Sequence, residues 1–252
     1  MSVVDHDSPA PPEEQEKRGA QSGSAWHLIA IAIGWSLLAT AFSFLFGFMT
    51  GLVASLYRVP TTSNLQILSA QMGSLGFNGV LLVAALIQGR IAGSGGLAVA
   101  WAMNPVSRLP MIVFMAVVIA AYAVLVHLTV GAARADLVSK ISLTGPWLAL
   151  FYVLRVSILV PLAEELLFRG WLWTALQRRW DVLPTALLTS AVWLAMHLGL
   201  EISTPVVLLP VAVILALARH FGRSVYASIA LHAVYNLVAV ISLWALKAAG
   251  LI

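Results

Sequence analysis

Long uncharged stretches of apolar residues, separated by short polar segments, make up most of this 252-residue chain. An α-helix rises about 1.5 Å per residue, so about 20 apolar residues cross the hydrocarbon core of a bilayer. The pattern therefore predicts an all-α, polytopic membrane helix bundle. The predicted spans are Leu28–Tyr57, Val59–Gly89, Leu109–Ala133, Pro146–Leu176, Pro184–Leu200, Pro205–Ala218 and Val225–Leu246.

Two segments fall outside this series of spans. Residues 1–25 are rich in Pro, Glu, Ser and Gly and predict a disordered polar tail, which leaves residues 26–252 as the transmembrane domain. The stretch Arg90–Arg108 is apolar but short, and glycines and Pro105 interrupt it. It is either an interfacial piece or an eighth span, so the sequence predicts seven or eight transmembrane helices.

Composition supports a membrane protein. The chain is 61% hydrophobic and 10% charged, whereas soluble domains have about 45–50% and 25%. Its basic residues are scattered, one or two per loop, which is typical of the positive-inside bias and not of a nucleic-acid surface. The absence of cysteine excludes disulfides and cysteine-ligated metals. We expect a multi-pass integral protein of a bacterial cell membrane.

Ionisable side chains within apolar helices are the candidates for chemistry, because each costs at least about 2.5–3.5 kcal/mol at mid-membrane. Glu165 and Arg169 are four residues apart, so they share one helix face and can form an ion pair. Glu164 points about 100° away and cannot use the same arginine equally well. We therefore expect Glu164 to be an unpaired carboxylate suited to general-base work.

Two later helices carry the other polar groups. His197 follows Trp193 by four residues, and Asn236 follows His232 by four. A lone histidine on an apolar helix is more often a satisfied core residue, and a His–Asn stripe is equally a hydrogen-bonding clasp between helices. Counted from the polar turns at one end of the bundle, however, Glu164, His197 and Asn236 all lie roughly 20 Å deep, and His232 roughly 14 Å. That shared layer favours a single internal site.

A carboxylate, two histidines and an amide fit a hydrolase. The carboxylate and a histidine can hold and deprotonate water, and the other two groups can donate to an oxyanion. The same donors could bind zinc, although the helical His-Glu-x-x-His signature is absent. A serine mechanism is weaker, because no Asp partner lies in the membrane.

Three motifs, in this order on three helices, carry a resemblance to a known family. They are Glu-Glu-x-x-x-Arg (Glu164, Glu165, Arg169), Trp-x-x-x-His (Trp193, His197) and His-x-x-x-Asn (His232, Asn236). Residues 146–246 thereby resemble the CPBP/Abi intramembrane peptidases, which include the type II CAAX prenyl proteases. Trp193 departs from the pattern, since phenylalanine is usual there.

The resemblance implies specific roles. Glu164 would activate water that His197 positions, while His232 and Asn236 would form the oxyanion hole. Glu165, Arg169 and Trp193 would support them. The implied enzyme is a glutamate-type endopeptidase without a cofactor.

The sequence leaves three alternatives to that enzyme. They are a zinc-dependent form of the same peptidase, a non-catalytic membrane scaffold or immunity protein, and, less favoured, a proton-coupled carrier. The expected partners are the lipid bilayer and a peptide or protein substrate that is lipidated or membrane-bound, and no nucleic acid.

Overall fold

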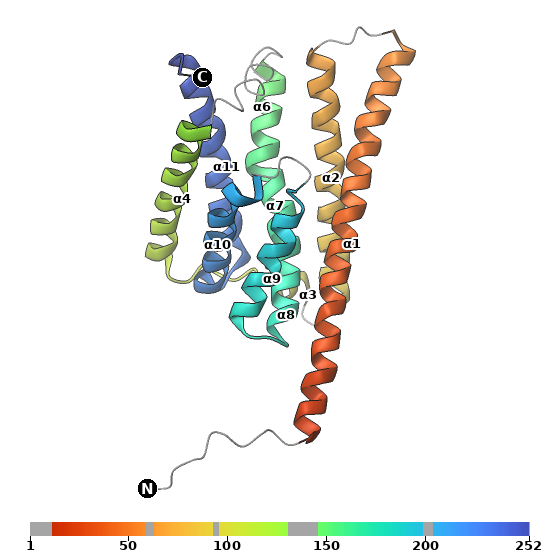
Figure 1. The fold of residues 1–252 in the computed structure, drawn as a ribbon, viewed down its shortest axis with the longest axis vertical. Coiled ribbons are helices and arrows are strands. Elements are labelled where there is room, and N and C mark those ends of the chain that lie inside the picture. Colours follow the sequence, from red (N-terminus) through yellow and green to blue (C-terminus); the bar gives the residue numbers. More distant parts are fainter. Residues whose placement is uncertain (1–11, 59–62, 93–95, 131–145, 199–203, 252) are drawn as a thin grey trace.

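The computed structural model of the chain describes residues 12–58, 63–92, 96–130, 146–198 and 204–251. Every regular element in these ranges is helical (Figure 1), which confirms the predicted fold class. The elements are α1 (Pro12–Leu56), α2 (Ser63–Ala92), α3 (Gly96–Ala100), α4 (Leu109–Val130), α6 (Pro146–Leu154), η2 (Arg155–Leu159), α7 (Val160–Glu165), η3 (Leu166–Leu172), α8 (Trp173–Gln177), α9 (Val182–Ala195), α10 (Thr204–Gly222) and α11 (Val225–Ala248).

The described residues hold six helices long and apolar enough to cross a membrane, and the protein is an integral multi-pass membrane protein. The spans are Ala25–Leu56, Leu65–Ala92, Leu109–Thr129, Pro146–Gln177, Thr204–Gly222 and Val225–Ala248. The remaining predicted span is the shorter α9, of 14 residues. Helix α3 has five residues, so the described residues of the Arg90–Arg108 region hold no helix long enough to form an eighth span.

Helix α1 begins within the segment that was expected to be a disordered tail. It begins at Pro12, and residues 1–11 lie outside the described part of the chain. Proline is favoured in the first turn of a helix. This local preference opposes the disorder that the polar composition favours.

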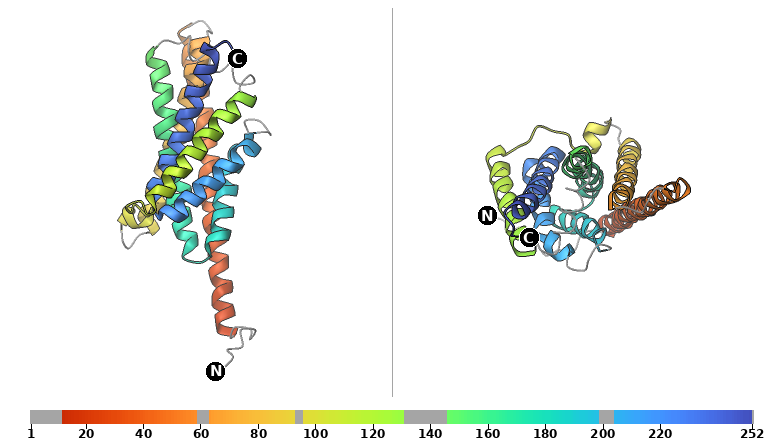
Figure 2. Two further views of the ribbon diagram at one scale, coloured as in Figure 1. Left: turned by 90° about the vertical axis from the view of Figure 1, so that its left-hand side faces the viewer. Right: turned by 90° about the horizontal axis from the view of Figure 1, so that it is seen from above.

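The helix that carries the Glu pair occupies the middle of the bundle. Its segments α7 and η3 contact α2 and α11, and η3 also contacts α1 and α9. Figures 1 and 2 show the α1–α2 pair on one side of it and the helices α4, α10 and α11 on the other. This position lets side chains from several helices meet at Glu164 and Glu165.

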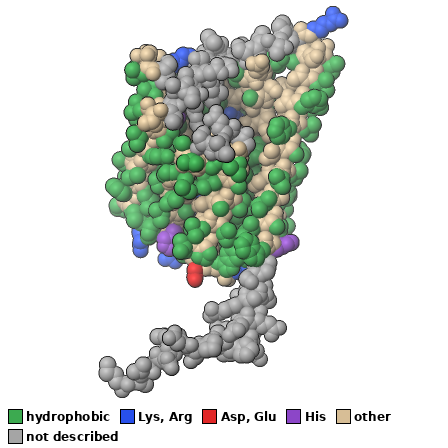
Figure 3. All heavy atoms as spheres, in the orientation of Figure 1, with side chains coloured by type: hydrophobic (Ala, Val, Ile, Leu, Met, Phe, Trp, Pro, Cys, Tyr) green, Lys and Arg blue, Asp and Glu red, His purple; other side chains and the backbone are tan. Residues whose placement is uncertain are grey.

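The outer surface matches a lipid environment. Apolar side chains cover the sides of the molecule, and charged side chains gather at its two ends (Figure 3). At one end the described helices end or begin beside six arginines, and at the other beside Arg58 and Lys247. The six are Arg90, Arg108, Arg178, Arg179, Arg219 and Arg223. We call this end the arginine-rich end.

Candidate active site

Two π-helical segments flank the Glu pair. The segment η2 ends at Leu159 and η3 begins at Leu166, with the six-residue α7 between them. Single turns of π-helix are rare and are frequent at functional sites. Pro161 contributes to the first of them, because it has no backbone N–H and cannot maintain the regular ladder.

Glu164 forms no ion pair with a described residue, as the sequence predicts, but its carboxylate accepts a hydrogen bond. The indole Nε1–H of Trp193 donates a 2.6 Å hydrogen bond to its Oε2. Glu164 is 5% exposed and Trp193 is 1% exposed, so water does not weaken this bond. The sequence did not indicate this bond, because the donor lies 29 residues away on α9 and helical spacing around Glu164 gives no information about it.

Trp193 also contacts the other polar groups of the site. Its ring centroid lies 4.6 Å from that of His197 and 5.7 Å from that of His232, the latter edge to face. The guanidinium carbon of Arg169 lies 5.1 Å from the centre of the indole, which is cation–π distance. One side chain thus touches the carboxylate, both histidines and the arginine.

Glu165 forms the predicted ion pair with Arg169, and it has a second partner. Arg169 Nη1 lies 3.1 Å from Oε1 of Glu165, and both side chains are fully buried. His232 Nδ1 lies 3.0 Å from the same oxygen. The bond from His232 joins α11 to α7, so Glu165 fixes both the motif helix and one candidate catalytic ring.

The two histidines have defined tautomers. His197 Nδ1 lies 2.9 Å from the backbone oxygen of Trp193. A carbonyl only accepts, so this nitrogen carries the proton and Nε2 of the neutral ring is an acceptor. His232 Nδ1 likewise donates to the Glu165 carboxylate. Its Nε2 donates as well only when the ring is doubly protonated.

His197 lies just beyond α9 rather than in the middle of a helix. Helix α9 ends at Ala195, and the next turn tightens through bonds from His197 N to Leu194 O and from Leu198 N to Ala195 O. Such short-range bonds commonly satisfy the last carbonyls of a helix. The side chain of His197 is half-buried, whereas that of His232 is 3% exposed.

Asn236 makes its described contact with the backbone of the motif helix. Its Nδ2 donates to Val156 O at 2.8 Å. The N–H of Val160, the usual helical partner of that oxygen, bonds to Arg155 O instead. The next candidate is Pro161, which has no N–H. Asn236 therefore satisfies a carbonyl that the π-helical register leaves open, and its second amide N–H is left for another acceptor.

Arg155 is a further buried cation whose partners the sequence did not indicate. Its Nε donates to Gln71 Oε1 at 2.7 Å, and its Nη1 donates to the hydroxyl of Ser74. Both partners lie on α2, so this arginine ties α2 to the motif helix one residue before Val156. The only sign of these contacts in the sequence is that Gln71 and Ser74 are polar residues within the predicted second span.

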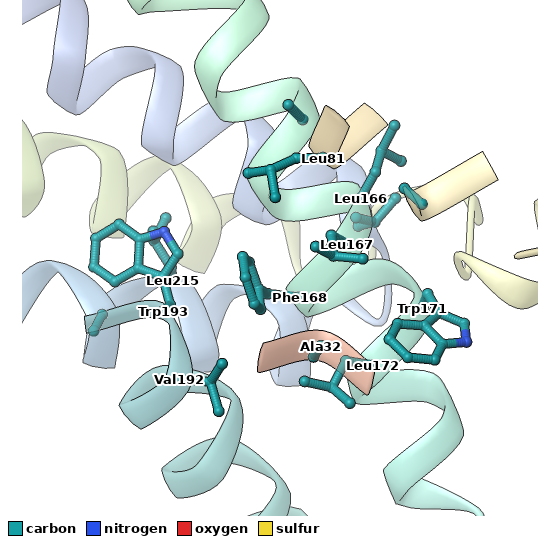
Figure 4. Packing of buried hydrophobic residues seen from close by; sticks show 14 of the residues in the cluster. Ala32, Leu81, Leu166, Leu167, Phe168, Trp171, Leu172, Val192, Trp193 and Leu215 are labelled. Carbon is teal, nitrogen blue, oxygen red and sulfur yellow. The ribbon is translucent and has the colours of Figure 1, made fainter. Parts of the chain in front are cut away.

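Apolar packing surrounds the site. Phe168, which is fully buried, points from η3 to the side where Trp193 and Leu215 lie, whereas Leu81 and Leu166 pack on another side of the same helix (Figure 4). The contacts keep water from the flanks of the polar cluster and hold the indole in place. A low-dielectric wall strengthens the hydrogen bond and ion pair inside it.

The donor set does not fit a metal ion in this geometry. The described residues contain no group of three His, Asp or Glu side chains placed to hold one. Two of the candidate donors, Glu164 and Glu165, are engaged by Trp193, Arg169 and His232. The zinc alternative therefore lacks a third ligand within this part of the chain.

Comparison with known proteins points to the segment that carries the site. Residues 146–238 match the family model described as type II CAAX prenyl endopeptidase Rce1-like. No curated protein and no solved structure matches the chain. The match runs from the start of α6 through the greater part of α11 and includes all seven candidate residues. Residues 146–238 are therefore similar to the Rce1-like family of CAAX-protease-like membrane peptidases, which is consistent with the CPBP/Abi group.

Proposed function

We propose that this protein is an intramembrane endopeptidase in which Glu164 activates water to hydrolyse a peptide bond. The observation that carries the proposal is the cluster around Trp193, where a carboxylate and two histidines from three helices meet inside the membrane layer. A buried cluster of this kind is costly to a membrane protein and is a functional candidate by default.

The first step uses the oxygen of Glu164 that Trp193 does not hold. Trp193 occupies Oε2, and no partner among the described residues holds Oε1. A water molecule between Oε1 and Nε2 of His197 would lose its proton to Glu164 as its oxygen attacks the peptide carbonyl carbon. The histidine nitrogen is an acceptor, because Nδ1 carries the ring proton.

The second step places negative charge on the former carbonyl oxygen. Doubly protonated His232 would donate to this oxyanion through Nε2, with the Glu165 carboxylate as its counter-ion at 3.0 Å. The remaining N–H of Asn236 would be the second donor. The C–N bond then breaks, and the proton held by Glu164 passes to the leaving amine, so the net reaction consumes one water.

Peptide substrates of this site would be membrane-bound, because the catalytic groups lie within the apolar layer. The family description adds the expectation of a lipidated substrate. We propose that the protein resides in a bacterial cell membrane with the arginine-rich end inside.

Comparative sequencing of protein C-termini tests the proposal. Cells expressing wild type are compared with cells expressing equal membrane-inserted amounts of Glu164→Gln and His197→Ala. The expected result is a set of new C-termini in wild type that both variants lack. Identical sets in all three strains contradict a peptidase and favour the scaffold alternative.

A further inference from the structure

A polar cavity lies at the arginine-rich end, and its lining contains none of the residues of the Glu164 site. It has a volume of about 470 Å³ and lies between the segment before α4, the end of α8, the start of α9 and the turn between α10 and α11. The lining side chains that matter here are Asn104, Arg108, Arg219, His220 and Arg223.

The walls of the cavity are tied together by hydrogen bonds. Ser107 N bonds to Gly222 O at 2.9 Å, and Val225 N to Ala102 O at 3.1 Å. Asn104 Nδ2 donates to Arg223 O at 3.1 Å, and the hydroxyl of Ser224 donates to Asn104 O at 2.6 Å. These hydrogen bonds join backbone groups of the two segments to each other or to the side chains of Asn104 and Ser224. They therefore use none of the cationic side chains that line the cavity.

The charged side chains that line the cavity are all basic. Its lining contains three arginines and a histidine and no acidic side chain. Asp181 precedes the lining residue Val182 but is not itself part of the lining. Arg108 packs its guanidinium 5.3 Å from the ring centre of Phe221, which holds this cation against the wall. An anion is the complementary ligand.

Arg219 provides a buried cation at the edge of the cavity. It is 5% exposed, its Nε donates to Arg169 O at 2.7 Å, and its Nη2 donates to Thr174 at 3.2 Å. Its guanidinium also lies 5.7 Å from the ring centre of Trp173. No partner among the described residues holds Nη1. The same side chain therefore lines the cavity and holds the helix that carries the catalytic motif.

The level of the cavity suggests the source of the anion. Its residues lie where α8 and α10 end and α9 and α11 begin, at the end of the bundle where charged side chains replace the apolar surface (Figure 3). A bilayer whose hydrocarbon core covered the apolar sides of the bundle would place its lipid phosphates at this level. Basic pockets between transmembrane helices on the cytoplasmic side bind anionic lipid headgroups, and arginine pairs well with phosphate.

We propose that this cavity binds the phosphate of an anionic phospholipid headgroup. The proposal does not depend on peptidase activity, since the binding groups are separate from Glu164 and its partners. Through Arg219, a bound headgroup would touch the side chain that fixes Arg169 O.

Lipid titration of the purified full-length protein in neutral detergent tests the proposal, with bound lipid counted by native mass spectrometry. The probes are phosphatidylglycerol, phosphatidylcholine and inorganic phosphate. Wild type is expected to retain phosphatidylglycerol in preference to phosphatidylcholine. The double variant Arg108→Asn/Arg223→Asn is expected to bind it about thirtyfold more weakly. Asparagine suits these positions, because their φ values are 50° and 52°.

The matched control removes the same charge from the same end outside the cavity. Arg90 and Arg178 are exposed at the arginine-rich end, and Arg90→Gln/Arg178→Gln is expected to bind like wild type. Equal weakening in both double variants would show general surface attraction and overturn the proposal. Equal retention of phosphatidylcholine, or inorganic phosphate that binds as tightly as phosphatidylglycerol, would also overturn it.

A measurement on wild type keeps the test independent of variant folding. A phosphatidylglycerol analogue with a photoreactive headgroup is cross-linked to the protein, and the labelled peptides are identified. Labelling within 102–108 or 219–223 is expected. Labelling spread evenly over the ends of the bundle contradicts a defined pocket.

Discussion

The indole of Trp193 donates its N–H to Glu164 at 2.6 Å, and this bond holds one oxygen of the candidate base in place. Phenylalanine is usual at this position in the family that the segment resembles. Its side chain fills similar space but has no hydrogen-bond donor. The bond therefore belongs to this sequence and not to the general motif. In the proposed mechanism it orients the second oxygen of Glu164 toward the attacking water.

Replacing Trp193 by phenylalanine tests this role directly. A hydrogen bond to a charged group is worth about 1.5–3 kcal/mol, so we expect kcat to fall about tenfold to a hundredfold while KM changes little. Trp173→Phe is the matched control, because Trp173 is equally buried and its N–H has no described partner. Equal rates for wild type and Trp193→Phe would refute the role.

The Glu165–Arg169 pair is expected to stabilise the fold more than it serves the chemistry. Glu165→Ala leaves a fully buried arginine without its carboxylate and is expected to lower the free energy of unfolding by about 3–5 kcal/mol. Glu165→Gln/Arg169→Met removes both charges and should recover part of that loss. Denaturant unfolding in detergent measures both variants, and a double variant less stable than Glu165→Ala contradicts the prediction.

Asn236 and Pro161 are expected to be coupled through Val156 O. Asn236→Ala leaves that carbonyl without a donor and should cost about 1–3 kcal/mol of stability. In a Pro161→Ala background a backbone N–H becomes available to the carbonyl, so the same substitution should cost less. A double-mutant cycle with fully additive effects would show that the carbonyl is not shared.

Close packing of α1 on α2 predicts different tolerance at two glycines of α2. A Cβ at Gly73 would lie 2.9 Å from the backbone oxygen of Ser43, whereas one at Gly79 meets nothing within 4 Å. We expect Gly73→Ala to lower the free energy of unfolding by about 1–3 kcal/mol and Gly79→Ala to be neutral. Thermal unfolding of the two variants in one detergent measures both effects, and an equal loss of stability in the two would contradict the prediction.

The sequence predicted the helical membrane fold and the Glu165–Arg169 pair, because both depend on local periodicity. It did not predict the bonds from Trp193 to Glu164 and from His232 to Glu165, since these depend on how distant helices pack. The link between Asn236 and Val156 depends on a π-helical register that a 3.6-residue period does not show. The end of α9 at Ala195 was missed for a related reason, because apolar residues continue past it.

Metal content separates the proposed mechanism from its zinc alternative. Without a third ligand among the described residues, the purified protein should contain well below one zinc per chain and should keep its activity in a chelator. Stoichiometric zinc, or loss of activity on chelation with recovery on zinc addition, would favour the metalloenzyme.

The most direct test of the account is the rate at which Glu164→Gln cleaves a natural substrate in proteoliposomes. Glutamine preserves the size of the side chain and can still accept the Trp193 hydrogen bond, but it cannot take a proton from water. The account predicts a loss of at least about a thousandfold, with insertion and unfolding temperature unchanged. Cleavage by this variant at the wild-type rate would contradict Glu164 as the base.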